Sequence, residues 1–282
     1  MSMKKGITIG TFGMPDKTLK EKFLIAKDAG FDGVELSVDE AGAITLDTTK
    51  DEIKKISDTA KECGIEIHSV TSSTFFKYSL SSENCNSRKL AADYIKKEIE
   101  TAQVCGADTI LFVPGLVDAS IAGRQEVIPY DVAYENALRG VKELVPIAED
   151  AGVNLAVENV WNKFLLSPLE MRSFIDECDS EYVGAYFDVG NVLQTGFPEH
   201  WIKILGSRIK RVHVKDFKSP VGNILGFSQL LSGSVNYPVV MKALAEIGYD
   251  KWITSEVSPS AYYPEATVYN TAMAMDYIIG NK

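Results

Sequence analysis

One pattern recurs along this 282-residue chain: a helical segment ends, a glycine follows, and a short apolar run comes next. Five copies are present, and in them the helix end and its glycine span residues 26–30, 60–64, 102–106, 148–152 and 244–248. A glycine at this place can take a positive φ and end the helix, after which a strand buried on both faces can begin. Repeated units of this kind stack their strands in parallel.

The apolar runs number eight when those outside the strict repeat are included. Strands are expected at residues 7–11, 34–36, 65–70, 109–113, 153–157, 182–187, 209–214 and 252–256. Helices are expected at residues 19–29, 50–63, 87–105, 131–150, 168–178 and 236–247. Because no linker or composition shift divides this alternation, we predict a single α/β domain over residues 1–282, folded as a (β/α)₈ TIM barrel.

Composition and charge argue against several classes of protein. No apolar run is long enough for a signal peptide or a membrane span, so we expect a cytoplasmic protein without membrane contact. Thirty-nine acidic against 29 basic side chains give a net charge of −10, which disfavours nucleic acid as a partner. Whether the chain forms a homo-oligomer is left open.

Polar residues end the last four predicted strands, and in a barrel of this kind the C-terminal strand ends form the active-site face. These residues are Glu158, Asp188, His213 and Glu256. Three carboxylates and an imidazole that converge need a cation, because like charges at short range raise one another's pKa. The set suits one Mn²⁺, Mg²⁺ or Co²⁺, and Zn²⁺ is a further ion that such a site can hold in crystals.

The segments around these residues carry a family resemblance. They read AVEN at 156–159, FDVGN at 187–191, VHVKD at 212–216 and SE at 255–256. Together they resemble the xylose-isomerase-like TIM-barrel superfamily, particularly its ketose 3-epimerases and L-ribulose or L-xylulose 5-phosphate 3-epimerases. The resemblance implies that the four residues bind one divalent ion. It also implies that Glu158 and Glu256 act as acid and base on opposite faces of a sugar, with Asp188 and His213 as ligands only.

Two positions depart from the pattern of the free-ketohexose 3-epimerases. Leu165 stands where many of them carry an acidic residue, and Asn191 where they carry a substrate-contacting histidine. Inosose dehydratases, hydroxypyruvate isomerases and other aldose–ketose isomerases share a similar ligand set and stay alternatives. An abasic-site endonuclease is a remote alternative, because its multinuclear zinc site needs many histidines and this chain has three. A non-catalytic sugar-binding protein would have no use for the four strand-end ligands.

The resulting hypothesis is a metal-dependent isomerase that epimerises a sugar or sugar phosphate at C3. The substrate would chelate the ion through its C2 carbonyl and C3 hydroxyl oxygens, and the two glutamates would exchange the C3 proton through a cis-enediolate. Further candidate substrate contacts are Asn191, Lys215, Asp216, Trp161 and Glu35.

Three of these candidates have a structural alternative. Asp216 either orients a ligand or caps a helix, Glu35 either reaches the substrate or lies on the rim, and Trp161 either walls the pocket or packs in a lid. A phosphate group would be recognised by backbone N–H groups or by nearby lysines. The lysines available for this are Lys77, Lys163, Lys215 and Lys218.

Overall fold

Eight parallel strands close into a barrel in the computed structural model, which describes residues 3–120, 123 and 126–280. The barrel strands are β1 (Lys4–Thr8), β2 (Gly33–Ser37), β3 (Glu66–Thr71), β4 (Thr109–Phe112), β5 (Asn154–Glu158), β6 (Val183–Asp188), β7 (Ile209–Val214) and β10 (Trp252–Ser255). Their order around the barrel is β1-β10-β7-β6-β5-β4-β3-β2. The predicted TIM barrel is therefore confirmed.

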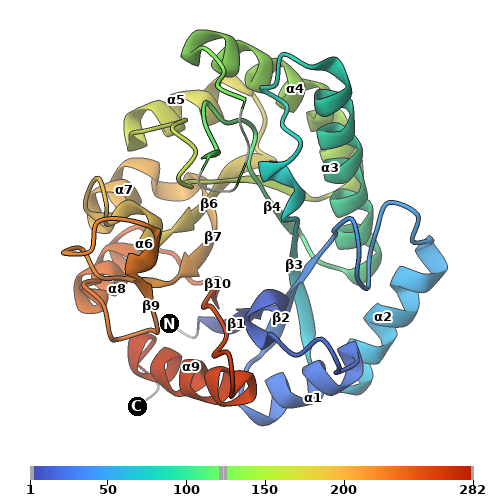
Figure 1. Cartoon of the computed structure of the whole chain (residues 1–282), viewed down its shortest axis with the longest axis vertical. Helices are drawn as coiled ribbons and strands as arrows, with labels where there is room; N and C mark the ends of the chain where they lie inside the picture. The colour runs from blue at the N-terminus through green and yellow to red at the C-terminus, as the bar shows by residue number, and fades with distance from the viewer. Residues whose placement is uncertain (1–2, 121–122, 124–125, 281–282) are drawn as a thin grey trace.

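Helices surround the barrel (Figure 1). They are α1 (Leu19–Asp28), α2 (Lys50–Glu62), α3 (Cys85–Cys105), α4 (Tyr130–Ala151), α5 (Pro168–Glu177), α6 (Val189–Val192), α7 (Pro198–Leu205), α8 (Tyr237–Glu246) and α9 (Pro264–Ile278). Helices α7 and α9 add to the six predicted ones, and α6 is a single turn directly after β6. In the described part of the chain, no helix has both the length and the apolar character needed to cross a membrane.

The repeated glycines end their helices as predicted. All five have φ between 68° and 86°, a region in which a Cβ atom would be strained. After α3, the amide of Gly106 donates to carbonyl oxygens of the last helical turn, at Ala102 and Gln103. The chain can then turn directly into the next buried strand.

The first strand lies earlier than predicted. The sequence pattern placed it at residues 7–11, whereas β1 ends at Thr8 and a 3-10 turn, η1 (Ile9–Phe12), follows. The pattern missed the lysines at the start of β1 because lysine is seldom buried without a partner. Lys5 is buried here because its Nζ lies 2.6 Å from Oδ1 of Asp276 in α9.

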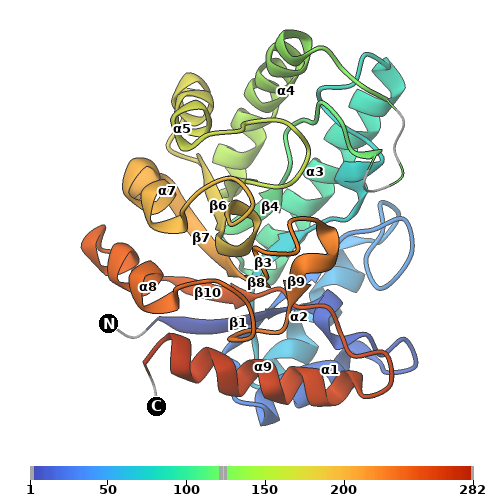
Figure 2. The ribbon, with the colours of Figure 1, turned by 60° about the vertical axis from the view of Figure 1, so that its left-hand side comes forward.

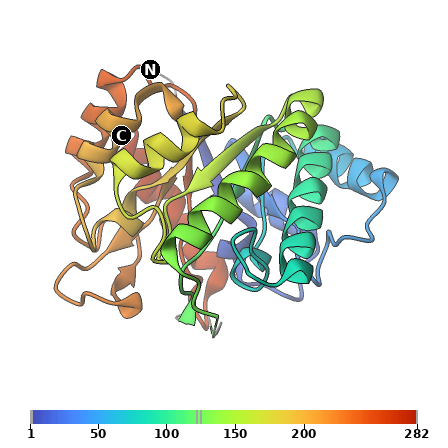
Figure 3. The ribbon, with the colours of Figure 1, turned by 90° about the horizontal axis from the view of Figure 1, so that it is seen from above.

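The segment after β7 forms a small antiparallel hairpin from β8 (Asp216–Phe217) and β9 (Phe227–Ser228). Figure 3 shows this orange segment projecting from one end of the barrel, at the opposite end from the N-terminus. Figure 2 shows both chain ends on one side of the molecule, near β1 and α9. The end that carries the hairpin is the end at which the barrel strands finish, and it contains the site described next.

Candidate metal centre

The four predicted ligands meet at the C-terminal ends of β5, β6, β7 and β10. Glu158 and Asp188 end their strands, His213 is next to last in β7, and Glu256 follows β10 directly. The strand register helps to bring the four residues together, because Asp188 lies opposite His213 in the β6–β7 pair. One ligand atom from each of the four residues lies within 4.8 Å of every other.

Two buried atoms of the cluster make no hydrogen bond with any described residue: Oδ2 of Asp188 and Nδ1 of His213. Nδ1 lies 3.2 Å from Glu256 Oε2, 3.8 Å from Glu158 Oε1 and 4.0 Å from Asp188 Oδ2. A buried polar atom that makes no hydrogen bond is costly, and a cation among the ligand atoms would compensate both. The donor set of three carboxylates and one imidazole therefore fits a divalent ion.

The crowding of charges shifts the pKa values of the cluster. Burial raises the pKa of Glu158, and it raises the pKa of Asp188 to about 7 against the attraction of Lys215. Burial acts in the same sense on Glu256, but Lys215 and His213 outweigh it and hold the pKa of that carboxyl low. Burial opposes protonation of His213, yet the surrounding carboxylates raise its pKa. An ion that binds here displaces a proton from the imidazole, so its apparent affinity rises with pH.

Lys215 directs its ammonium group into the cluster. Its Nζ lies 2.7 Å from Glu256 Oε2 and 3.4 Å from Asp188 Oδ2. These carboxylates raise the pKa of Lys215 although burial opposes the charged form. The side chain also lies over the ring of Phe227, with 5.5 Å between Nζ and the ring centre. Lys215 is thus brought to the cluster as a charged group.

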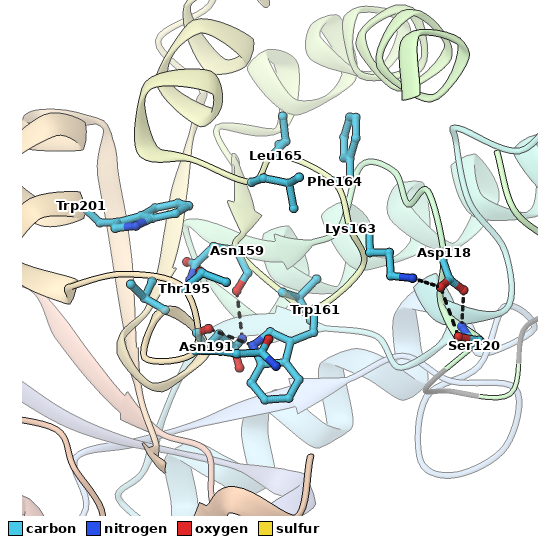
Figure 4. A pocket seen from close by; sticks show the side chains of 14 residues that line it. Asp118, Ser120, Asn159, Trp161, Lys163, Phe164, Leu165, Asn191, Thr195 and Trp201 are labelled. Atoms are coloured by element: carbon cyan, nitrogen blue, oxygen red, sulfur yellow. Dashed lines mark hydrogen bonds and ion pairs between the residues drawn. The ribbon is translucent and has the colours of Figure 1, made fainter. Parts of the chain in front are cut away.

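Asn191 and Trp161 lie beside the cluster. The backbone N–H of Asn191, in α6, donates to Oδ1 of Asp188 at 2.6 Å. Its side-chain amide lies 3.5 Å from Glu158 Oε1. The indole N–H of Trp161 donates to the carbonyl oxygen of Asn191 at 2.8 Å, as Figure 4 shows. These contacts tie the loop after β5 to the short helix after β6.

Asn159 has a role that sequence reasoning missed. Its side-chain amide donates to the carbonyl oxygen of Asp188 at 2.8 Å and accepts from the amide of the same residue at 2.9 Å. Asn159 therefore fixes the backbone at one ligand. It belongs to the AVEN segment, and its place directly after Glu158 was the available signal.

Glu35 does not lie on the rim, so that alternative is wrong, and a contact with substrate stays a prediction. Its side chain is fully buried, with Oε1 3.1 Å from Nε2 of His213 and Oε2 accepting from the hydroxyl of Ser69 at 2.7 Å. It contacts the imidazole on the side away from the other carboxylates. A strand-end carboxylate is ordinarily solvated, and the partner that buries this one lies 178 positions away in the sequence.

Asp216 neither orients a metal ligand nor caps a helix, so both interpretations of this residue are wrong. It is 1% exposed, and its carboxylate accepts three backbone N–H groups, from Phe217 at 2.9 Å, Gly233 at 2.9 Å and Val235 at 3.1 Å. Two of these donors lie on the far side of the β8–β9 hairpin. Asp216 therefore holds the ends of segment 216–235 together.

We expect Asp216→Ala to loosen segment 216–235, because three N–H groups lose their acceptor, and for the buried N–H of Phe217 the loss costs about 1–3 kcal/mol. Hydrogen exchange should accelerate in this segment, with metal affinity changed less than about threefold because Asp216 is no ligand. Asp216→Asn retains one acceptor oxygen and should have a smaller effect. Weaker metal binding with unchanged exchange would contradict this role.

A cavity of about 530 Å³ opens beside the cluster and is large enough for a monosaccharide. Its aromatic walls are formed by Phe75, Phe76, Trp161 and Phe227, and its hydroxyl groups come from Thr8, Thr11, Ser228 and Ser258. A second cavity, of about 340 Å³, lies next to it and shares Trp161 and Asn191 (Figure 4). Trp161 thus lies in the wall of both cavities.

Three of the four lysines proposed to recognise phosphate are held by carboxylates, and Lys215 is one of them through Glu256 and Asp188. Nζ of Lys77 lies 2.6 Å from Glu40 Oε1, and Nζ of Lys163 lies 2.7 Å from Asp118 Oδ2 (Figure 4). Of the four lysines named above, Lys215 lines the larger cavity.

The fold and the cluster together define a (β/α)₈ barrel with a candidate cation site at its C-terminal face. The model of one family, the xylose isomerase-like TIM barrel, matches residues 23–275. The chain belongs to this family.

Individual proteins resemble the chain at low identity. The L-ribulose-5-phosphate 3-epimerase of Salmonella paratyphi A is 27% identical over an alignment of 263 residues, and the match covers 87% of this chain and 86% of that protein. An uncharacterized protein of Methanocaldococcus jannaschii is 27% identical over 197 residues, which are 68% of this chain and 64% of that protein's length. The solved structure of an L-ribulose 3-epimerase superimposes with a TM-score of 0.79 at 16% identity, over 99% of this chain and 95% of its own. This structural likeness shows the shared fold.

Proposed function

We propose that the protein is a divalent-metal-dependent isomerase that inverts C3 of a ketose or ketose phosphate. The observation that carries the proposal is the position of the two glutamates in the cluster. Glu158 on β5 and Glu256 after β10 lie at the two ends of a four-strand arc, with Asp188 and His213 between them. A substrate held over the arc would have one carboxylate on each side. The epimerases among the relatives support the same reaction.

The reaction needs one proton to leave C3 and another to arrive from the opposite face. A divalent ion held by the four ligands, Mn²⁺, Mg²⁺ or Co²⁺, would polarise the carbonyl at C2 and make the neighbouring C3 proton acidic. One glutamate removes this proton, and the second, protonated glutamate then delivers its own to the other face of the enediolate. Each such proton transfer increases the rate by about 10²- to 10⁴-fold. The aromatic walls of the cavity keep water away from the enediolate.

Lys215 and Asn191 support this chemistry from the same cavity. The ammonium group of Lys215 would stabilise negative charge that develops on the sugar oxygens. The amide of Asn191 faces Glu158 and would restrain that carboxylate while it transfers a proton.

We expect Lys215→Met to change metal affinity and turnover in opposite directions. Loss of a positive charge beside the ion should tighten metal binding by roughly 3- to 10-fold. Loss of the charge facing the substrate should lower kcat by roughly 10- to 100-fold. Calorimetric titration with Mn²⁺ and initial rates measure the two effects, and Lys218→Met is a control with the same charge change. Weaker metal binding in Lys215→Met would contradict this role.

A substrate panel tests the proposed function. Pentuloses and hexuloses, free and as 5- or 6-phosphates, are incubated with the protein and Mn²⁺, and products are identified by NMR. We expect a C3 epimer from at least one ketose, loss of activity on chelation, and recovery when Mn²⁺ is restored. An aldose product would identify an aldose–ketose isomerase, and loss of water from the substrate would identify a dehydratase. Either product in place of the epimer would overturn the proposal.

A further inference from the structure

We propose that Glu35 is a positioning residue: from behind the candidate metal centre it holds His213 so that Nδ1, and not Nε2, is the metal ligand. The inference rests on the metal site of the proposed function and is independent of which sugar the protein binds. It also gives a role to a buried carboxylate that the proposed reaction does not use.

The two nitrogens of His213 face different surroundings. Nε2 lies 3.1 Å from Oε1 of Glu35, whereas Nδ1 faces the ligand carboxylates, the nearest of them Glu256 at 3.2 Å. A carboxylate can only accept, so Nε2 must carry the hydrogen in this contact. In the neutral ring the lone pair then lies on Nδ1, directed at the centre of the cluster.

Glu35 is itself held in place by buried partners. Its second oxygen accepts the hydroxyl of Ser69 at 2.7 Å. The same hydroxyl lies 2.9 Å from Nδ1 of His68 and 3.3 Å from the hydroxyl of Tyr186. Because both carboxylate oxygens have partners and the side chain is fully buried, Glu35 cannot turn away without breaking hydrogen bonds in the barrel interior.

The barrel backbone departs from regular register at these residues. Two register shifts occur in the described strand pairs, one between Val34 and Glu35 and one between Ala185 and Tyr186. The first shift sets Glu35 opposite Ser69. After the second comes Tyr186, whose ring lies edge-on to His213 with 4.4 Å between ring centres. Bulges near active sites re-aim side chains, and here both direct a side chain toward the same imidazole.

A carboxylate at position 35 does more than fill space. Its charge favours hydrogen on Nε2 and increases the basicity of Nδ1 as a ligand. Glutamine has nearly the same shape, but its NH₂ group can donate to Nε2 and so favour hydrogen on Nδ1, where it blocks the metal. We therefore expect Glu35→Gln to weaken Mn²⁺ binding by about 10- to 100-fold.

The test measures Mn²⁺ affinity by calorimetry and the His213 ring by ¹⁵N NMR of the Mg²⁺-loaded and metal-free protein. In the wild type we expect hydrogen on Nε2 and a slowly exchanging Nε2–H proton. Glu35→Gln should lose that slow proton and bind Mn²⁺ more weakly. Glu98→Gln changes another buried glutamate, one in α3, and should match the wild type in both measurements.

Wild-type Mn²⁺ affinity together with an unchanged His213 ring in Glu35→Gln would overturn the inference. If Glu35→Gln does not fold, Ser69→Ala removes one restraint on the carboxylate and should give a smaller loss, about 2- to 5-fold; an unchanged affinity there would also overturn it. The readouts are independent of turnover. If wild-type protein epimerises no ketose but Glu35→Gln binds Mn²⁺ weakly, the proposed reaction fails and the role of Glu35 stands.

Discussion

Replacing Glu158 or Glu256 by glutamine is expected to slow epimerisation strongly while each variant still exchanges the C3 proton of one epimer with solvent. Glutamine retains a carbonyl oxygen for the metal but has no basic site, so net inversion should fall by about 10²-fold or more. The remaining glutamate faces one side of C3. It can remove and return a proton on that side only.

Incubation in heavy water shows which epimer each glutamine variant exchanges. One variant should introduce deuterium at C3 of one epimer, and the other variant should label its partner, which NMR detects separately. Glu98→Gln, a buried substitution in α3, should behave as the wild type. Exchange of the same epimer by both variants, or deuterium only at C1, would exclude the two-base mechanism and favour an aldose–ketose isomerase.

The second large effect is expected from His213→Ala and Asp188→Ala, each of which should lower metal affinity by more than about 10²-fold and abolish activity. Each substitution removes a ligand atom that is buried without a hydrogen bond among the described residues. The barrel should stay folded, because apolar side chains of the same strands, such as Phe187, Val212 and Ile253, are fully buried and unchanged.

Metal analysis of the dialysed protein measures the loss of metal binding, and circular dichroism measures whether the barrel is still folded. Wild-type protein should retain one ion per chain, and the variants none, with similar far-ultraviolet spectra. His213→Ala should be the less stable of the two, because it leaves the buried carboxylate of Glu35 without one of its partners. A variant that is unfolded in metal-free buffer would mean that these residues serve the core. Two or three ions per wild-type chain would contradict a mononuclear site.

The barrel and its four strand-end residues could be predicted because their signals are local. A glycine after a helix marks where five of the strands begin, and a polar residue at the end of a buried run stands out within a few positions. Parallel register then brings Glu158, Asp188, His213 and Glu256 together without any information on distant contacts.

The predictions that were wrong depend on contacts between residues far apart in the sequence. Lys5 lies in β1 because Asp276, 271 positions away, neutralises it. Glu35 is buried through His213, at a separation of 178 positions. Asp216 accepts from backbone N–H groups, which every residue except proline has, so the amino-acid types at its partners' positions do not reveal the contact. In each case the partner became visible only in three dimensions.

The bond between Glu35 and His213 has a consequence for how the molecule assembles. It joins the second strand to the seventh strand of the barrel, and the barrel itself closes where β1 meets β10. During synthesis, Glu35 leaves the ribosome 178 residues before its imidazole partner, so we expect it to stay hydrated until β7 has been added to the barrel. Contacts between segments so far apart form late in folding. If the four ligands bind Mn²⁺ as proposed, high affinity is expected only at closure, and in refolding experiments uptake of Mn²⁺ should lag behind helix formation.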